Sequence, residues 1–128
     1  VRCLRHTLAT GGWVCGAFLS SPEEARGVLK GFVSVEGIPL GNRRQYGDLS
    51  SLHVSREMRG RGIGRRLFTR AVEFAGTLGV EKLYISSHPA VETQAFYRAM
   101  GCVEAQEYQP EHGEREPQDY PLEYVLSR

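Results

Sequence analysis

Residues 59–64, Arg-Gly-Arg-Gly-Ile-Gly, form the segment of the sequence whose residue types point most directly to a chemical task. The three glycines lack a Cβ, so their backbone amides can approach an anion closely. A helical pattern follows at once, and the first turn of a helix leaves backbone donors unpaired and carries partial positive charge. Arg59, Arg61 and Arg65 add charged donors at the same end. The segment therefore predicts a binding site for a phosphate or pyrophosphate group.

A tight turn with solvated arginines is the alternative explanation for this segment. Cations at a helix N-terminus oppose the helix dipole and cost stability unless an anion is bound, which favours the phosphate site. The segment lacks the Gly-x-x-x-x-Gly-Lys-Ser/Thr pattern of nucleotide hydrolases. Its third glycine, Gly64, also comes too early for the dinucleotide-binding fingerprint. Neither of those nucleotide-binding classes is supported.

Hydrophobic periodicity places the phosphate segment between a strand and a helix. Residues 48–54 alternate as in a half-buried strand, which predicts that Ser50, Leu52 and Val54 share one face. Apolar residues after position 62 then recur at helical spacing. Gly79 follows the last of them, as is typical of a helix C-terminus.

The rest of the chain predicts further strands and one more helix. Polar connections are expected at residues 20–27 and 37–47, and residues 1–12 could be a strand or the remnant of a helix. The order strand, helix, strand implies a parallel crossover. We therefore predict a single α/β (α+β) domain over residues 1–128, with one mixed, mostly antiparallel sheet and helices on both faces. The remaining predicted strands are residues 13–19, 28–35, 82–86, 102–108 and 120–126, and the second helix is residues 91–100.

Composition and charge limit the classes of protein to which this sequence can belong. The 128 residues are 41% hydrophobic and 24% charged with a net charge of +1, and no apolar run approaches the roughly 20 residues of a membrane span. A near-zero net charge argues against a dedicated nucleic-acid binder. Cys3, Cys15 and Cys102 are odd in number and widely spaced, which predicts buried, reduced thiols and no zinc site. We expect a cytoplasmic protein with no nucleic-acid partner, membrane or metal.

Residues 59–64 resemble the Arg/Gln-x-x-Gly-x-Gly/Ala motif of the GNAT superfamily of acyl-CoA N-acyltransferases. The Leu-His-Val at residues 52–54 and the apolar helix after the motif match the same pattern. Further on, Ala-Phe-Tyr-Arg-Ala-Met-Gly-Cys at residues 95–102 is similar to the family's second signature, an apolar-Tyr pair before Gly-Phe. The resemblance extends from about Trp13 to the C-terminus.

This resemblance implies an N-acetyltransferase that moves the acetyl group of acetyl-CoA to a primary amine of a small molecule or peptide. The amine would attack directly in a ternary complex. The strands at residues 48–54 and 82–86 would splay apart to admit the thioester. The resemblance implies that main-chain groups bind the pantetheine arm and that amides, with the Arg59 side chain, bind the pyrophosphate. The implied cofactor-binding residues are Leu52, His53 and Val54 for the pantetheine arm and Arg59, Gly60, Arg61, Gly62, Ile63, Gly64 and Arg65 for the pyrophosphate.

The resemblance also implies catalytic roles. Tyr97, at the position of the family's tyrosine, would contact the cofactor and protonate the departing sulfur. The Val54 amide would stabilise the oxyanion. Asp48 is the candidate general base, and His53 and His88 are alternatives that could relay a proton through water.

One departure from the family pattern concerns the pantetheine arm. The family often has an asparagine about seven residues before the tyrosine, where this sequence has Ala90. Ser87 is the candidate for the missing contact, with Ser86 and His88 as alternatives.

A second departure lies at the front of the chain, where little corresponds to the family's usual first strand and helices. A non-catalytic acyl-CoA-binding or regulatory module of the same fold is therefore the alternative function, and completion by a homodimer partner is a further expectation. The acidic segment at residues 107–123 could attract a cationic amine or could be a solvated loop.

Overall fold

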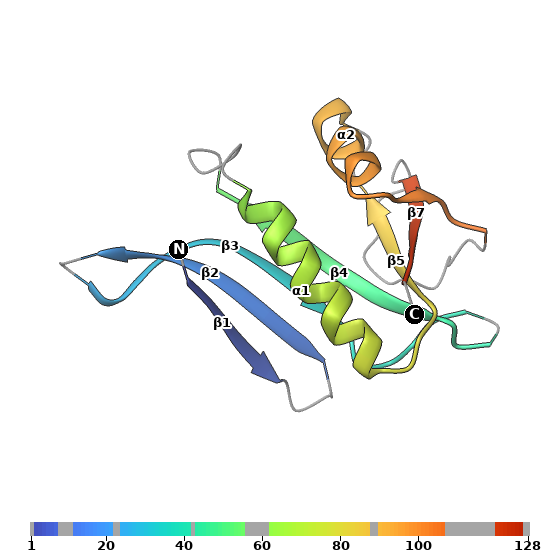
Figure 1. Cartoon of the computed structure of the whole chain (residues 1–128), viewed down its shortest axis with the longest axis horizontal. Helices are drawn as coiled ribbons and strands as arrows, with labels where there is room; N and C mark the ends of the chain where they lie inside the picture. The colour runs from blue at the N-terminus through green and yellow to red at the C-terminus, as the bar shows by residue number, and fades with distance from the viewer. Residues whose placement is uncertain are drawn as a thin grey trace.

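A computed structural model describes residues 2–7, 12–21, 24–41, 43–55, 62–87, 90–106 and 120–126. Within these residues one seven-stranded sheet has the order β1-β2-β3-β4-β5-β7-β6 (Figure 1). The β4–β5 pair is parallel and every other pair is antiparallel, which confirms the predicted mixed sheet with a parallel strand–helix–strand core. The elements are β1 (Arg2–Thr7), β2 (Trp13–Ser21), β3 (Glu24–Val35), β4 (Tyr46–Val54), α1 (Ile63–Thr77), β5 (Lys82–Ser87), α2 (Val91–Ala99), β6 (Val103–Glu104) and β7 (Tyr120–Val125).

The N-terminal strands decide one open alternative and correct one prediction. Of the strand and the helix remnant left open for the start of the chain, the described residues 2–7 form the strand β1, antiparallel to β2. The polar connection predicted at residues 20–27 is wrong in extent, because β2 continues to Ser21, which lies opposite Glu24 of β3. Backbone hydrogen bonds between the strands extend them into polar residues, which a hydrophobic pattern does not predict as strand.

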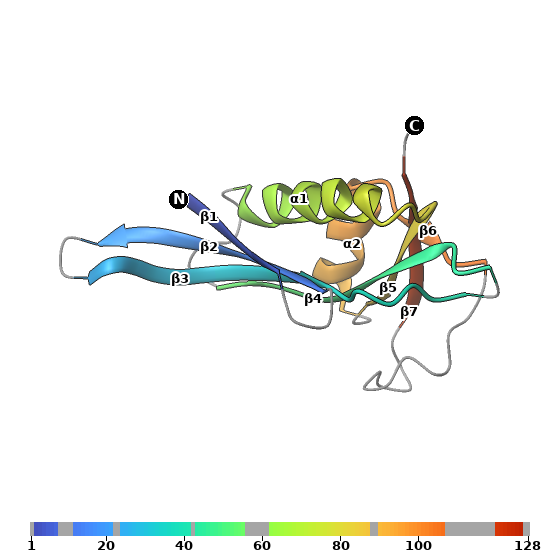
Figure 2. The same ribbon diagram turned by 90° about the horizontal axis from the view of Figure 1, so that it is seen from below.

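Helix α1 covers one face of the sheet and contacts β2, β3, β4 and β5 (Figure 2). Trp13 of β2 stacks on Phe74 of α1, with 5.2 Å between the ring centroids and an interplanar angle of 8°. The helix stops where Gly79 adopts a left-handed φ of 76°, as the sequence predicts. Neither described helix is both long and apolar enough to cross a membrane. The buried side chains of α1 recur at helical spacing: Ile63, Leu67, Phe68, Ala71 and Ala75.

A β-bulge in β4 corrects the predicted alternation of that strand. Leu49 pairs with Val35 but Ser51 pairs with Ser34, so Ser50 is an extra residue in β4. Ser50 therefore turns away from α1, and its hydroxyl lies 2.8 Å from that of Ser34. Leu52, in contrast, packs against the core below α1. The prediction that Ser50 shares the face of Leu52 is wrong for this reason.

A cluster of aromatic rings holds α2 and β7 against α1. Phe68 of α1 lies at its centre, with ring centroids 6.5 Å from Phe96, 6.3 Å from Tyr97 and 5.2 Å from Tyr124, all edge-on. Such edge-to-face pairs add about 0.5–1.5 kcal/mol each beyond the area that they bury. The cluster therefore fixes the position of α2, the helix that carries the predicted general acid.

The cysteines differ in state. Cys102 is a free, buried thiol, as expected. Cys15 in β2 is buried but disulfide-bonded, so the expectation of a reduced thiol is wrong at this position. The remaining cysteine of the chain, Cys3, lies in the neighbouring strand β1, where its backbone is opposite Ala17.

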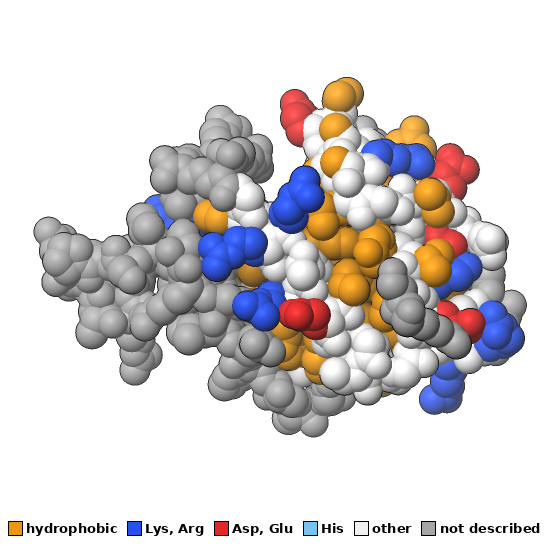
Figure 3. Space-filling view, viewed as in Figure 1, with side chains coloured by type: hydrophobic (Ala, Val, Ile, Leu, Met, Phe, Trp, Pro, Cys, Tyr) orange, Lys and Arg blue, Asp and Glu red, His pale blue; other side chains and the backbone are white. Residues whose placement is uncertain are grey.

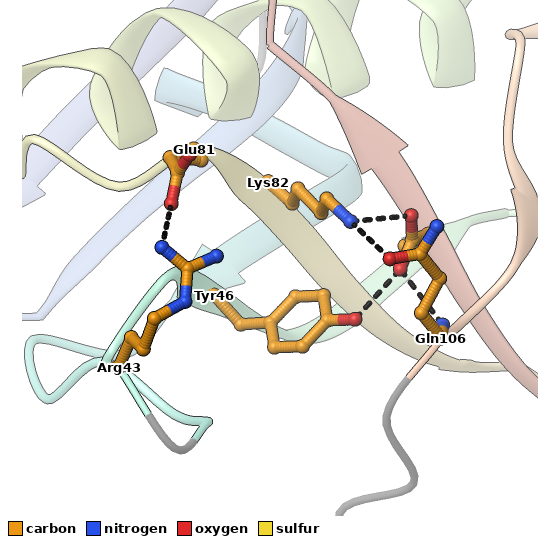
Figure 4. A network of polar contacts seen from close by, with 6 residues as sticks. Arg43, Tyr46, Glu81, Lys82 and Gln106 are labelled. Atoms are coloured by element: carbon orange, nitrogen blue, oxygen red, sulfur yellow. Dashed lines mark hydrogen bonds and ion pairs between the residues drawn. The ribbon is translucent and has the colours of Figure 1, made fainter.

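A buried polar cluster joins the ends of β4, β5 and β7 (Figure 4). The carboxylate of Glu123, 2% exposed, accepts a hydrogen bond from the Tyr46 hydroxyl at 2.6 Å and from the Gln106 amide at 2.9 Å. Lys82 Nζ lies 3.0 Å from its second oxygen. Burial acts to raise the pKa of Glu123, but these hydrogen bonds and the Lys82 charge outweigh burial and hold the pKa below its ordinary value.

This lowered pKa predicts how stability depends on pH. The stabilisation is present above the ordinary glutamate pKa of about 4.3 and is lost as the pH falls through the lower folded-state pKa. Urea unfolding midpoints should therefore fall steeply below about pH 4 in the wild type. Glu123→Gln should lower the free energy of unfolding by roughly 2 kcal/mol at neutral pH and should reduce the fall of the urea midpoint below about pH 4. The control is Glu104→Gln, which removes an exposed carboxylate in β6. An equal reduction in that variant would show that Glu123 is not the source of the pH dependence.

Candidate active site

A gap opens between β4 and β5, as predicted from the resemblance. The two strands pair in parallel only as far as Leu49 and Ile85. Beyond that point β4 continues to Val54 beside β3, whereas β5 continues to Ser87 beside β7. The strands therefore diverge in the middle of the sheet, where a ligand can enter between them.

The backbone of β4 presents hydrogen-bonding groups to this gap. The Ser55 amide donates to the Lys30 carbonyl of β3 at 2.7 Å. In an antiparallel pair the hydrogen-bonded positions alternate, so the amides of Leu52 and Val54 point away from β3, toward the side from which β5 has diverged. These two amides are therefore placed to contact a ligand that lies in the gap.

The N-terminus of α1 lies at the same gap and presents backbone amides there. Gly62 is the N-cap, with a left-handed φ of 78°, and the Arg66 amide makes a helical bond to its carbonyl at 3.1 Å. The amides of Ile63, Gly64 and Arg65 precede that bond, so the helix itself offers them no acceptor. The first turn has no acidic residue. Lys and Arg side chains gather over this half of α1 (Figure 3), which favours an anion at the helix start.

Gly64 lies in close contact with α2 at the start of α1. A Cβ at this position would lie 3.1 Å from Cε1 of Phe96 and 3.7 Å from Cγ2 of Val54. A larger residue there would therefore require the Phe96 ring to shift slightly.

The first cavity, of about 730 Å³, runs from the α1 N-terminus along β4 to α2. Most of the predicted cofactor-binding residues meet here. Arg59, Gly60 and Arg61 belong to the same prediction but lie outside the described residues. The cavity is lined by Leu52, His53, Val54, Gly62, Ile63, Gly64, Arg65, Ala90, Glu92, Thr93, Phe96, Tyr97, Ala99 and Met100.

A second cavity, of about 620 Å³, adjoins the first across the gap. It shares Leu52, His53, Thr93 and Tyr97 with the first cavity. Ser87, the other predicted cofactor-binding residue, lines only the second cavity. The remaining lining residues are Phe32, Leu49, Ser50, Ser51, Ile85 and Ser86.

Tyr97 lies where the two cavities meet and is only 7% exposed. Burial, with a smaller contribution from the nearby Cys102, raises the pKa of Tyr97 well above the ordinary phenol value. Burial likewise raises the pKa of the Cys102 thiol to about 12, against a smaller opposing effect of Arg98. Both groups therefore keep their protons at neutral pH, and the tyrosine hydroxyl is available as a hydrogen-bond donor.

The other predicted site residues take different positions. Asp48 is 7% exposed, lies opposite Tyr84 in β5, and is not among the residues that line either cavity. The Ser87 hydroxyl donates to the Tyr120 carbonyl at 2.9 Å and accepts from Gln94 Nε2 at 2.8 Å. Ser87 thus ties β5 to both β7 and α2. His88 lies outside the described residues.

Sequence reasoning missed several residues that line the site. Thr93, Phe96 and Met100 line the first cavity from the same face of α2 as Tyr97. Their helical spacing from Tyr97 is visible in the sequence and could have identified them. Phe32, in contrast, reaches the second cavity from β3, and no local sequence signal marks it. Among the residues with described positions, no group of three or more His, Cys, Asp or Glu side chains could hold a metal ion.

Comparison with known proteins gives a consistent result. A family model described as "Acetyltransferase (GNAT) family" matches residues 8–102. No curated protein sequence matches the chain.

Solved structures share the fold at low sequence identity. A GNAT-family acetyltransferase from Staphylococcus aureus Mu50 superposes with a TM-score of 0.71 at 17% identity, covering 92% of this chain and 70% of that one. The IAA acetyltransferase from Bacillus cereus gives 0.64 at 23% identity, with coverage of 90% and 78%. The PaiA N-acetyltransferase from Thermoplasma acidophilum, solved with coenzyme A, gives 0.60 at 21% identity, with coverage of 88% and 59%. At these identities the likeness establishes the fold alone.

Proposed function

Because the chain belongs to the GNAT acetyltransferase family, we propose that it transfers the acetyl group of acetyl-CoA to a primary amine of a small molecule or peptide. The observation that carries this proposal is the pair of cavities that meet at the β4–β5 gap. One cavity leads to a helix N-terminus suited to a pyrophosphate, and the other leaves room for an acceptor. Both substrates can therefore be bound together, and the amine can attack the thioester directly.

The cofactor would lie in the first cavity. Its pantetheine arm would bind the free backbone groups of Leu52 and Val54, and its pyrophosphate would bind the amides at the start of α1. Arg65 lines the cavity at that end, where its charge would add to the anion site. Arg59, Gly60 and Arg61 complete the proposed pyrophosphate loop.

The chemistry would take place at the junction of the two cavities. The Val54 amide would stabilise the oxyanion as the amine attacks the carbonyl carbon. Tyr97, kept protonated by its burial, would donate its proton to the departing sulfur. Asp48, the base predicted from the sequence, lines neither cavity, so it could act on the amine only through water, and a residue that lines the cavities is better placed to accept the proton.

The first test is a calorimetric titration of the chain with acetyl-CoA and with dephospho-CoA. We expect saturable one-to-one binding of acetyl-CoA, and weaker binding of dephospho-CoA if the arginines over α1 reach the 3′-phosphate. Release of thiol on adding amines would then establish transfer. Binding without transfer to any amine would favour the alternative, a non-catalytic acyl-CoA module. No binding to a folded sample would contradict the proposal.

A further inference from the structure

His53 lies at the junction of the two cavities, on the acceptor side of β4. It is opposite Phe32 in β3, and the two rings are 5.9 Å apart at an interplanar angle of 39°. Successive residues of a strand point to opposite faces, so the His53 side chain points away from the face on which Leu52 and Val54 pack against the core. Its side chain is exposed. The imidazole can therefore contact a ligand in the second cavity.

Few ionisable side chains line the cavities in the described part of the chain. His53 and Tyr97 are the ionisable groups of the second cavity, and the first adds Arg65 and Glu92. Tyr97 is held in its protonated form by burial, so it cannot accept a proton. Histidine is the side chain that most often serves as a general base, because a ring nitrogen of the imidazole can accept a proton.

We propose that His53 is the group that accepts the proton of the acceptor amine during acetyl transfer, an inference that rests on the proposed function. The amine nitrogen forms a bond to the thioester carbon, and its proton passes to a ring nitrogen of His53. The carbon–sulfur bond breaks, and the sulfur takes the proton of Tyr97. Loss of the imidazolium proton to solvent and reprotonation of the tyrosine from solvent restore the protein, so protons balance overall.

Two different elements bring the proposed acid and base to the junction. Tyr97 reaches it from α2 and His53 from β4. The two proton transfers are therefore assigned to side chains that separate parts of the fold hold in place.

The side chains that face His53 from neighbouring elements include one charged group. On β3, Lys30 lies two residues before Phe32 and so on the same face of the sheet as His53. β5 contributes Ser86 and Ser87 to the cavity, neither of which is charged, and α2 contributes the neutral Tyr97.

The test uses acetyl-CoA with spermidine, glucosamine and a lysine-containing peptide as amine probes. His53→Gln should lower kcat by about 100-fold and leave the affinity for acetyl-CoA within about twofold. Added imidazole should partly restore the rate of His53→Ala, because the site is open to solvent; a merely structural role would not produce this rescue. Glu104→Gln, an exposed charge change in β6, is the control for nonspecific effects.

The outcomes separate the inference from the proposed function. Retention of the wild-type rate by a folded His53→Gln variant would overturn the inference and leave the transfer activity in place. A loss of kcat in Asp48→Asn at unchanged acetyl-CoA affinity, with His53→Gln unaffected, would assign the proton acceptor to Asp48 instead. A wild type that binds acetyl-CoA and acetylates none of the probes would contradict both the function and the role of His53.

Discussion

Replacing Tyr97 by phenylalanine should lower turnover about 100-fold while the affinity for acetyl-CoA stays within about twofold. The substitution removes the proton donor and keeps the ring, which packs edge-on against Phe68 and Phe96. The helix that carries residue 97 should therefore keep its position. The departing thiolate would have to leave without protonation, and this raises the barrier of the chemical step but not the binding energy of the cofactor.

The measurement is thiol release at saturating acetyl-CoA, beside calorimetric binding of the same cofactor. Tyr120→Phe is the matched control, because Tyr120 is about half exposed and lines neither cavity. Since burial raises the pKa of Tyr97, ionisation of this tyrosine should cause no loss of wild-type rate up to about pH 9. Equal losses of turnover and affinity would show that Tyr97 binds the cofactor and does not act as an acid.

Placing a carboxylate at the start of α1 should remove cofactor binding. We expect Gly62→Asp to weaken acetyl-CoA binding by on the order of 100-fold, because the new charge would occupy the end of the helix where the pyrophosphate is proposed to lie. The fold should survive this change. A Cβ at Gly62 would meet no atom within 4 Å, and aspartate tolerates a left-handed φ better than most residues.

Gly62→Asn is the control that distinguishes the effect of the added charge from the effect of the added side chain. Asparagine has nearly the same size and the same tolerance of a left-handed backbone, but it carries no charge. We expect it to bind acetyl-CoA far more tightly than Gly62→Asp does, with similar melting temperatures for the two variants. Equal loss of binding in both would mean that backbone strain, and not charge at an anion site, explains the effect. Unchanged acetyl-CoA binding in Gly62→Asp would show that the pyrophosphate does not bind at the start of α1.

Some features of this protein were determined by local sequence. The buried stripe of α1 and its left-handed end at Gly79 follow from residue spacing and from the backbone freedom of glycine, so both were predicted from the sequence. The proposed anion site at the α1 N-terminus also depends only on neighbouring residues. The parallel pairing of β4 with β5 follows from chain order, because a strand–helix–strand connection leaves the second strand parallel to the first.

Tertiary structure decided the remaining features. The bulge at Ser50 arises from the register between β3 and β4, which hydrophobic alternation within β4 cannot specify, and it turns Ser50 away from the core face. The strand identity of residues 2–7 depends on pairing with β2 and not on any local pattern. His53, Tyr97 and Phe32 line the same cavity but belong to three different elements, which packing brings together. Local sequence thus determined the secondary structure of α1 and the residue types at its start. The tertiary structure decided which residues line the cavities together, because strand pairing and burial bring together residues that are far apart in the chain.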